Sequence, residues 1–319
     1  MTRSAIVTGG AGFIGSHLVD ALVDLGADVV VLDDLSSGLA ANVNPAAHLV
    51  EADIQDKAAL DQAVAGCDLV FHQAARRAVL QSIEQPLETD RVNVGGTLSV
   101  LVAARDAGVS RVVFGASSSV YGGSAVLPTP ESAAANPRSP YAVTKYAGEL
   151  YCRVLAELDG LETVALRYFN VYGPRQRPDS RYAAVIPRFI AALMSGKPPE
   201  VHGDGLQSRH FTFVSDAVRA NLCAAHAEPL CSGRSYNVAG DRAFTLLEVL
   251  ETLESMLRVR VQPIHTAPRS GDIRRSLADL NAARRDLGYE PTVALPEGLR
   301  LTIASLVEQA TLEQEPIGE

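Results

Sequence analysis

The stretch that decides the fold is Ser4-Ala-Ile-Val-Thr8-Gly9-Gly10-Ala11-Gly12-Phe13-Ile14-Gly15. A short apolar run leads into glycines spaced Gly9-x-x-Gly12-x-x-Gly15, and residues 15–25 then have the apolar spacing of a helix. A strand, glycine-rich loop and helix in this order present backbone N–H groups and a helix N-terminus to a phosphate. The stretch predicts a dinucleotide site whose contacts are Gly9, Gly12, Phe13, Ile14 and Gly15, although a plain glycine-rich turn is the alternative.

Further apolar runs follow at 28–33, 48–52, 69–72, 112–116 and 163–167, with amphipathic stretches between them. The alternation of strands and helices predicts an α/β fold, a Rossmann-type doubly wound parallel sheet with helices on both faces. Ligands of such sheets bind beyond the carboxyl ends of the strands, so the residues that follow each run are the candidates for a site.

The composition of the chain changes after about Asn170. Loops rich in Pro, Gly and Arg at 173–178, 196–199 and 203–205 alternate with helical stretches at 185–194 and 245–257. We therefore expect an NAD-binding Rossmann domain at 1–170 and a smaller, discontinuous α/β substrate domain at 171–310. Segment 214–240 is expected to pack back on the first domain, and the polar tail 311–319 is expected to fray.

Composition limits the possible functions. The chain has 319 residues, a net charge of −9 and no basic stripe, which argues against nucleic-acid binding. No apolar run approaches the roughly eighteen residues of a membrane span, and the N-terminus enters a strand almost at once, so neither membrane span nor signal peptide is predicted. The cysteines (Cys67, Cys152, Cys223 and Cys231) show no CxxC spacing. They are expected to be free thiols in the cytoplasm and not metal ligands.

Acidic residues after the second and third strands refine the cofactor prediction. A carboxylate at Asp33 accepts hydrogen bonds from ribose hydroxyls and repels a 2′-phosphate, which favours NAD over NADP, and Asp34 strengthens the bias. The predicted site extends to Ser37 and Gly38. Asp53 and Ile54 are expected at the adenine, although Asp53 could also cap a helix.

Tyr141 and Lys145 form a candidate acid–base pair. They are four residues apart in a predicted helix and so project from one face. A phenol with a pKa of ~10 is a poor base near neutrality, but a nearby ammonium and a positively charged nicotinamide favour the phenolate. Ser117 follows a predicted strand and can hold a substrate hydroxyl in line with the tyrosine, with Ser118 beside it. The alternative is a surface helix with an ordinary i,i+4 pair.

With these motifs the chain resembles an extended short-chain dehydrogenase/reductase of the nucleotide-sugar 4-epimerase branch, from about residue 4 to residue 290. The resemblance implies an NAD cofactor and a UDP-sugar substrate. It implies that Tyr141 removes the 4-hydroxyl proton while hydride passes to NAD, and that the 4-keto sugar turns over before hydride returns. Related 4,6-dehydratases carry Asp-Glu where this chain has Ser118-Ser119, which argues against dehydration.

The resemblance also assigns residues around both ligands. Expected near NAD are Gln73, Ala74, Ala75, Arg77, Asn93 and Tyr168. Expected near the UDP-sugar are Ser119, Asn170, Arg177, Val185, His202, Arg209, Arg269, Asp272 and Ser276. Two positions depart from the family: His210 stands where an aspartate is usual, and His202 stands where an aromatic residue commonly stacks on uracil.

Two positions bear on which UDP-sugar is the substrate. Arg177 lies in Gln176-Arg-Pro-Asp179, as in uronic-acid epimerases, and its guanidinium suits a carboxylate at C6. It could instead lie on a solvated loop or pair with Asp179, and the neighbouring 182–188 look more like hexose members. Ser276 leaves room for several sugars. UDP-glucuronate/UDP-galacturonate is the leading prediction, ahead of UDP-glucose/UDP-galactose and UDP-GlcNAc/UDP-GalNAc.

Two further functions rank lower: UDP-glucuronate decarboxylation, and a non-catalytic NAD-binding sensor. The sensor is disfavoured because Tyr141, Lys145 and Ser117 are all present. Apolar residues in the helices expected at 85–108 and 140–158 predict a homodimer through a four-helix interface, as in the family.

Overall fold

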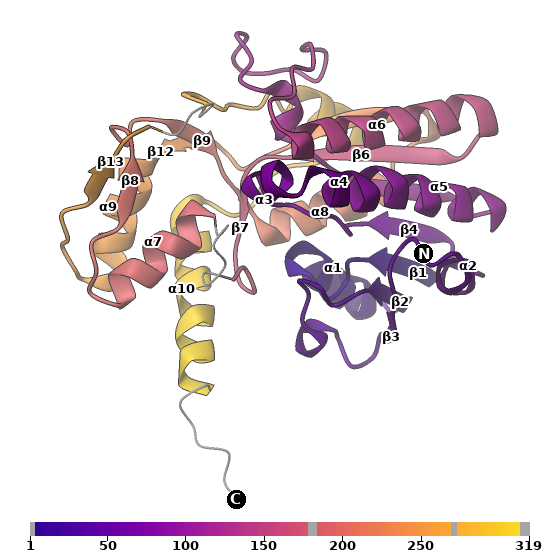
Figure 1. The fold of residues 1–319 in the computed structure, drawn as a ribbon, viewed down its shortest axis with the longest axis horizontal. Coiled ribbons are helices and arrows are strands. Elements are labelled where there is room, and N and C mark those ends of the chain that lie inside the picture. Colours follow the sequence, from indigo (N-terminus) through magenta and orange to yellow (C-terminus); the bar gives the residue numbers. More distant parts are fainter. Residues whose placement is uncertain (1–3, 178–183, 269–272, 313–319) are drawn as a thin grey trace, which may run out of the picture.

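The computed structural model describes residues 4–177, 184–268 and 273–312, with only the backbone described at 309–312. Its centre is a seven-stranded sheet in the order β11-β6-β5-β4-β1-β2-β3, and all its strand pairs are parallel (Figure 1). Its strands are β1 (Ser4–Thr8), β2 (Asp28–Asp33), β3 (His48–Glu51), β4 (Leu69–His72), β5 (Arg111–Ser117), β6 (Glu162–Tyr168) and β11 (Arg234–Val238). The predicted parallel α/β fold is confirmed.

Helices cover both faces of this sheet. On one face lie α1 (Phe13–Asp24) and α8 (Val214–Ala225), which contact each other and share a core with the sheet. On the other face lie α2 (Lys57–Val64), α5 (Gly96–Asp106) and α6 (Pro140–Asp159). Strand residues such as Val7 and Val70 are fully buried, because helices cover the sheet from both sides.

Shorter elements join these units. They are α3 (Val79–Glu84), α4 (Pro86–Asp90), the π-helical turn η2 (Arg91–Gly95), the 3₁₀ turns η1 (Ala40–Asn42), η3 (Ser118–Tyr121) and η4 (Pro229–Cys231), and the π-helical turn η5 (Ala283–Leu287). Helix α2 has its N-cap at Asp56, whose side chain accepts from the amides of Ala58 and Ala59. The alternative role of Asp53 as a helix cap is therefore wrong, because the N-cap lies three residues later.

A smaller unit stands to one side of the sheet (Figure 1). It contains α7 (Val185–Met194), α9 (Leu246–Leu257), α10 (Leu295–Leu312) and the short strands β7 (Val171–Tyr172), β8 (Glu200–His202), β9 (Ser208–His210), β10 (Thr212–Phe213), β12 (Ala243–Thr245) and β13 (Ile264–Thr266). Its own core includes Phe189, Val249 and Leu299. The capping box of Thr245 and Glu248 fixes the start of α9.

Segment 214–240 supplies two elements to the larger unit. Helix α8 packs on α1, β5 and β6, and β11 pairs with β6 at the edge of the sheet. The domain limits themselves stay a prediction. Helix α10 ends at Leu312, so the first two residues of the predicted tail 311–319 are helical, and the remainder lies outside the described residues.

A buried ion pair fastens α6 to the sheet. Arg167 Nη2 on β6 lies 2.7 Å from Glu149 Oε2 on α6, and both side chains are less than a tenth exposed. Arg167 Nη1 also donates to the Tyr121 hydroxyl (2.8 Å), which in turn donates to Asn237 Oδ1 on β11 (2.6 Å). These bonds compensate the burial of the charges, and they fix the helix that carries Tyr141 and Lys145.

Candidate active site

The glycine-rich loop leads from β1 into α1. Gly9 has φ +71°, and a Cβ there would lie 2.6 Å from the Ala74 amide nitrogen. A Cβ at Gly15 would collide with the Gly9 carbonyl oxygen. Helix α1 begins at Phe13 directly after Gly12, and no side chain caps it. The loop therefore leaves backbone close to any ligand and directs an uncapped helix N-terminus toward it.

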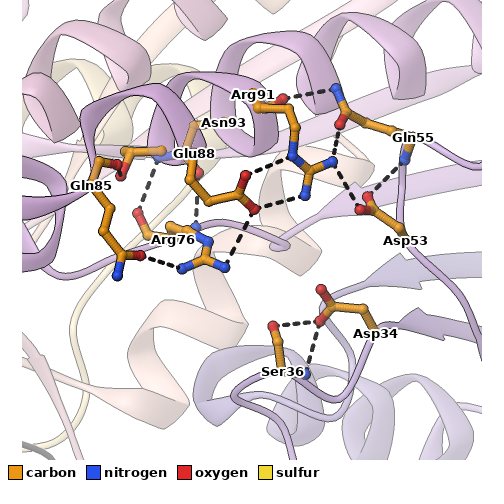
Figure 2. Close-up of polar contacts among 10 residues, drawn as sticks. Asp34, Ser36, Asp53, Gln55, Arg76, Gln85, Glu88, Arg91 and Asn93 are labelled. Atoms are coloured by element: carbon orange, nitrogen blue, oxygen red, sulfur yellow. Dashed lines mark hydrogen bonds and ion pairs between the residues drawn. The ribbon is translucent and has the colours of Figure 1, made fainter.

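Asp33 ends β2 beside this loop. Its carboxylate accepts hydrogen bonds from the amides of Ala11 (3.0 Å) and Leu35 (2.9 Å), and burial raises its pKa. It therefore also holds the glycine-rich loop in place, which the sequence did not suggest. Asp34 is exposed and accepts from the amide and hydroxyl of Ser36 (3.0 and 2.6 Å; Figure 2).

A cavity of about 350 Å³ runs over the carboxyl ends of the strands. Of the predicted residues, its lining includes Gly9, Gly12, Phe13, Ile14, Gly15, Asp33, Asp34, Ser37, Asp53, Ile54, Gln73, Ala74, Ala75, Arg77, Tyr141, Lys145, Tyr168 and Arg177. The motifs that follow separate strands thus meet in one place. Gly38 and Asn93 lie outside the lining: Gly38 is packed against Ala11, and Asn93 supports the lining from behind.

Several lining residues were missed by the sequence analysis: Asn42, Arg76, Gln81, Gly115 and Arg175. Arg76 could have been predicted as a lining residue, since it adjoins Arg77 in the same predicted loop. Arg175 has φ +64°, and its Nη1 lies 2.8 Å from Asp20 Oδ2 on α1. Because this contact joins segments far apart in the sequence, no local sequence pattern predicts it.

The residues present fit NAD. The close approach at Gly9, the uncapped start of α1 and the buried acid at the end of β2 provide the pyrophosphate and ribose contacts that a dinucleotide requires. Gln73 and Tyr168 face the same cavity and are held to Asn221, which donates to the Tyr168 hydroxyl (2.7 Å) and accepts from Gln73 Nε2 (3.0 Å).

Tyr141 lies in the first turn of α6. The N-cap Ser139 accepts from the Ala142 amide (3.2 Å), and the Tyr141 amide donates to Ser82 Oγ (3.1 Å). Burial raises the pKa of Tyr141, while a hydrogen bond with Ser117 and the charge of Arg77 lower it. Burial thus disfavours the phenolate of Tyr141, while Ser117 and Arg77 stabilise it.

Lys145 is buried beside the end of β5. Its ammonium donates to the Gly115 carbonyl (2.6 Å) and lies 4.8 Å from the centre of the Phe114 ring, and burial lowers its pKa to about 8. Among the neighbours of Tyr141, Arg77 is a cation whose charge lowers the pKa of the phenol, and the effect of Lys145 on the phenolate stays a prediction. The i,i+4 spacing places both side chains at the cavity, but the carbonyl at the end of β5 holds the ammonium.

The serine cluster stands beside the cavity. Ser117 ends β5, and its Oγ accepts from the Ser119 amide (3.2 Å). Ser118 and Ser119 lie in η3, and none of these three serines is part of the cavity lining. Of the three serines, Ser117 is the one that forms a hydrogen bond with Tyr141.

The predicted sugar-nucleotide residues gather partly around β9. Asn170 has φ +38° and donates to the His210 carbonyl (2.9 Å). The Ser276 amide donates to the Ser208 carbonyl (3.1 Å) on the same strand, which also carries Arg209. His202 ends β8, where its Nδ1 lies 2.7 Å from Thr266 Oγ1, and Val185 begins α7. Arg269 and Asp272 lie outside the described residues.

His210 has a structural role at its position. Its Nδ1 accepts from the Ala278 amide (3.1 Å), and burial lowers its pKa to about 4, so the imidazole is neutral. An aspartate at this position would place a charge in a buried site. The departure from the family pattern therefore fits the local packing.

Comparisons with known proteins agree with this geometry. The family model described as "NAD dependent epimerase/dehydratase family" matches residues 5–239. The UDP-glucose 4-epimerase of Mycolicibacterium smegmatis is 40% identical over 306 residues, covering 93% of this chain and 96% of the relative.

Solved structures extend the likeness. A UDP-glucose 4-epimerase from Thermotoga maritima, with UDP-glucose, matches with a TM-score of 0.92 and 36% identity, covering 97% of this chain and 100% of that one. A UDP-glucuronic acid 4-epimerase from Bacillus cereus, in complex with UDP-glucuronic acid and NAD, matches at TM-score 0.89 and 30% identity, covering 96% and 100%. The resemblance inferred from the sequence and the NAD cofactor are confirmed. None of the helices in the described residues is both long and apolar enough to cross a membrane.

Replacing Asp33 by Ala is expected to weaken NAD binding by about 10- to 100-fold, because charge-assisted hydrogen bonds contribute about 1.5–3 kcal/mol. The variant should also bind NAD and NADP more equally than the wild type. Titration calorimetry of cofactor-free protein with each nucleotide measures both effects. Asp34→Ala is the control with an exposed carboxylate, and equal losses in the two variants would show that burial and the loop contacts of Asp33 are unimportant.

Proposed function

We propose that this chain, which belongs to the NAD-dependent epimerase/dehydratase family, inverts C4 of a UDP-sugar, with UDP-glucuronate and UDP-galacturonate as the leading pair. The observation that carries the proposal is that Tyr141 and Arg177 line the same cavity as the glycine-rich loop. An acid–base group and a cation for a substrate anion thus stand next to the cofactor site.

The chain's own residues suit the proton transfers of such an inversion. When bound, NAD supplies the hydride acceptor and donor at the substrate carbon. Tyr141 would take the proton of the 4-hydroxyl and later return one, and Ser117 would keep the phenol and the substrate hydroxyl in line. Lys145, whose ammonium donates to the Gly115 carbonyl, lines the same cavity as Tyr141. Ser118 and Ser119 offer no carboxyl group for expelling water, which supports epimerisation over dehydration.

The positive charges of Arg177 and Arg77 support a uronate as the substrate. The guanidinium of Arg177 lies near enough to Arg77 to lower the pKa of Arg77, next to the larger effect of burial. An anion between two like charges relieves their repulsion and accepts planar, paired hydrogen bonds. A 6-carboxylate is such an anion. The 4-keto form of a uronate can lose CO₂ unless its carboxylate is held near the ring plane, so positioning this group would also protect the intermediate.

A neutral UDP-hexose is the second candidate. The Mycolicibacterium smegmatis relative, named a UDP-glucose 4-epimerase, is 40% identical, whereas the Bacillus cereus UDP-glucuronic acid 4-epimerase is 30% identical. Ser276, a small residue, sets no barrier against such sugars. Purified protein incubated separately with UDP-glucose, UDP-N-acetylglucosamine and UDP-glucuronate, with C4 epimers and released CO₂ resolved, decides among these substrates and decarboxylation. No conversion of any of the three would contradict the proposed function.

Replacing Tyr141 by Phe should lower kcat by about 10²–10⁴-fold, because the phenol handles the proton in flight. Binding of NAD and of the UDP-sugar, measured by calorimetry, should change little. Tyr146→Phe on the same helix is the control, with a rate near wild type. A Tyr141→Phe variant that still turns over at the wild-type rate would remove this residue from the mechanism.

Replacing Arg177 by Ala should reduce kcat/KM for UDP-glucuronate by roughly 10- to 1000-fold, for a loss of ~1.4–4 kcal/mol. Activity on neutral UDP-hexoses, where present, should change little. Arg188→Ala, which removes a half-exposed arginine paired with Glu200 on the neighbouring segment, is the control. Equal losses on charged and neutral sugars would make Arg177 a loop-organising residue instead.

We further propose a homodimer through the helices on one face. Exposed apolar side chains on α3 and α4 (Val79, Ile83 and Leu87) accompany a stripe along α6 (Val143, Ala147, Tyr151, Val154 and Leu158). Leu87 is 87% and Leu158 77% exposed in the single chain. Apolar residues on neighbouring helices suit a helix-bundle contact between two copies, in which α3 adds to the helices predicted at 85–108 and 140–158.

Replacing Val154 by Glu should shift the protein from dimer to monomer, because it places a charge within the α6 stripe. Multi-angle light scattering after size-exclusion chromatography measures the mass of each variant. Leu25→Glu is the matched control, since Leu25 is 65% exposed at the end of α1, which covers the opposite face of the sheet. A monomeric wild-type protein, or a dimer that withstands Val154→Glu, contradicts the proposed interface.

A further inference from the structure

The π-helical turn η2 touches both walls of the cofactor cavity. Arg91, its first residue, donates through Nη1 to Asp53 Oδ2 (3.0 Å) in the loop after β3. Asn93 accepts from the Arg76 amide (2.8 Å) and donates to the Arg76 carbonyl (3.0 Å) in the loop after β4. Asp53 and Arg76 both line the cavity. Figure 2 shows the two side chains of the turn reaching in different directions to these two loops. π-Turns are rare and often lie at functional sites.

A chain of alternating charges joins the same two walls. Glu88 accepts from Arg91 Nε and Nη2 (both 2.8 Å), and Arg76 Nη2 lies 3.4 Å from the same carboxylate. Gln85 accepts a further bond from Arg76 (3.2 Å). The hydrogen bonds to Glu88 and then Asp53 raise the pKa of Arg91. The order along this chain, Asp53, Arg91, Glu88 and Arg76, places each charge beside an opposite one (Figure 2).

The loop after β3 is also fastened to the turn by contacts of Gln55 and Ile54. Gln55 Nε2 donates to the Arg91 carbonyl (2.9 Å), and Gln55 Oε1 accepts from the Arg91 guanidinium. A Cβ at Gly96, directly after the turn, would collide with the Ile54 side chain. This close approach keeps Asp53 and Ile54, the predicted adenine contacts, against the helix pair α4–α5.

We propose that Arg91 is a positioning residue for NAD retention, which ties the Asp53 wall of the cavity to the Arg76 wall through Glu88. Without the Arg91 guanidinium, the link between the two loops through the turn would rest on the side-chain hydrogen bonds of Gln55 and Asn93 and on the packing of Ile54 against Gly96, and the cavity could open at its adenine end. Retention matters for an enzyme that must regenerate the same NAD molecule in every turnover. The inference depends on NAD binding and not on the choice of sugar.

The test is NAD affinity in cofactor-free protein. Arg91→Ala should raise the NAD dissociation constant by about three- to tenfold, consistent with about 0.7–1.4 kcal/mol for a networked, half-exposed ion pair. AMP, which carries only the adenine half, should lose affinity by a similar factor. Arg105→Ala is the matched control: its side chain is 39% exposed against 43% for Arg91, and it pairs with Asp106 and Asp159 away from the cavity. Its NAD affinity should equal that of the wild type.

Further measurements separate positioning from folding. Cofactor-free Arg91→Ala and Arg105→Ala should unfold at similar temperatures, and saturating NAD should restore the kcat of Arg91→Ala. Arg91→Lys and Glu88→Gln keep similar side-chain volumes and should each lose part of the NAD affinity, which covers the case in which Arg91→Ala folds poorly. NAD affinity within twofold of wild type in all three Arg91 and Glu88 variants, or an equal loss in Arg105→Ala, would overturn the proposal.

Discussion

The backbone of Gly9 lies against the backbone of Ala74, and the cofactor-binding half of the molecule is arranged around that contact. Gly9 follows β1 and Ala74 follows β4, so the contact places the glycine-rich loop beside the wall that carries Gln73 and Arg77. Behind it, Thr8 Oγ1 lies 2.7 Å from His72 Nδ1, and His72 Nε2 lies 2.9 Å from Thr97 Oγ1. Burial lowers the pKa of His72 to about 3, so this relay is neutral and keeps charge out of the core.

The charge of the chain is unevenly distributed in relation to this cavity. The protein as a whole carries −9, yet Arg76, Arg77, Arg175 and Arg177 all line the cavity. Arg76 and Arg175 are paired with Glu88 and Asp20, so part of their charge is neutralised locally. Asp33, Asp34 and Asp53 line the same cavity, so positive and negative side chains stand at different places along it. Arginines that line a cleft attract anions that enter it. This attraction suits ligands that carry a diphosphate.

The parts that the sequence predicted are those that depend on neighbours along the chain. The apolar runs of β1 to β6, the glycine spacing and the Tyr141–Lys145 spacing are local patterns, and each is present in the structure. Strands β9 and β12 have three residues each, too few to show a period. The partners of Lys145 and His210, and the Asp53 partner of Arg91, come from distant segments, so the roles of these residues depended on the tertiary structure. The resemblance to the family predicted which residues lie near the ligands. It did not predict that Asp33 also holds the glycine-rich loop through the amides of Ala11 and Leu35.

The place of β11 in the sheet has a consequence for synthesis of the protein. β11 is the edge strand beyond β6, and it reaches the sheet only after the chain has passed through β7, α7, β8, β9, β10 and α8. Until residue 238 has emerged from the ribosome, β6 presents an unpaired edge, and Tyr121 lacks its acceptor Asn237. The nascent chain thus carries its acid–base helix on an incomplete support for much of its translation. A pause or truncation before this point leaves an exposed strand edge next to apolar surface, a form prone to self-association.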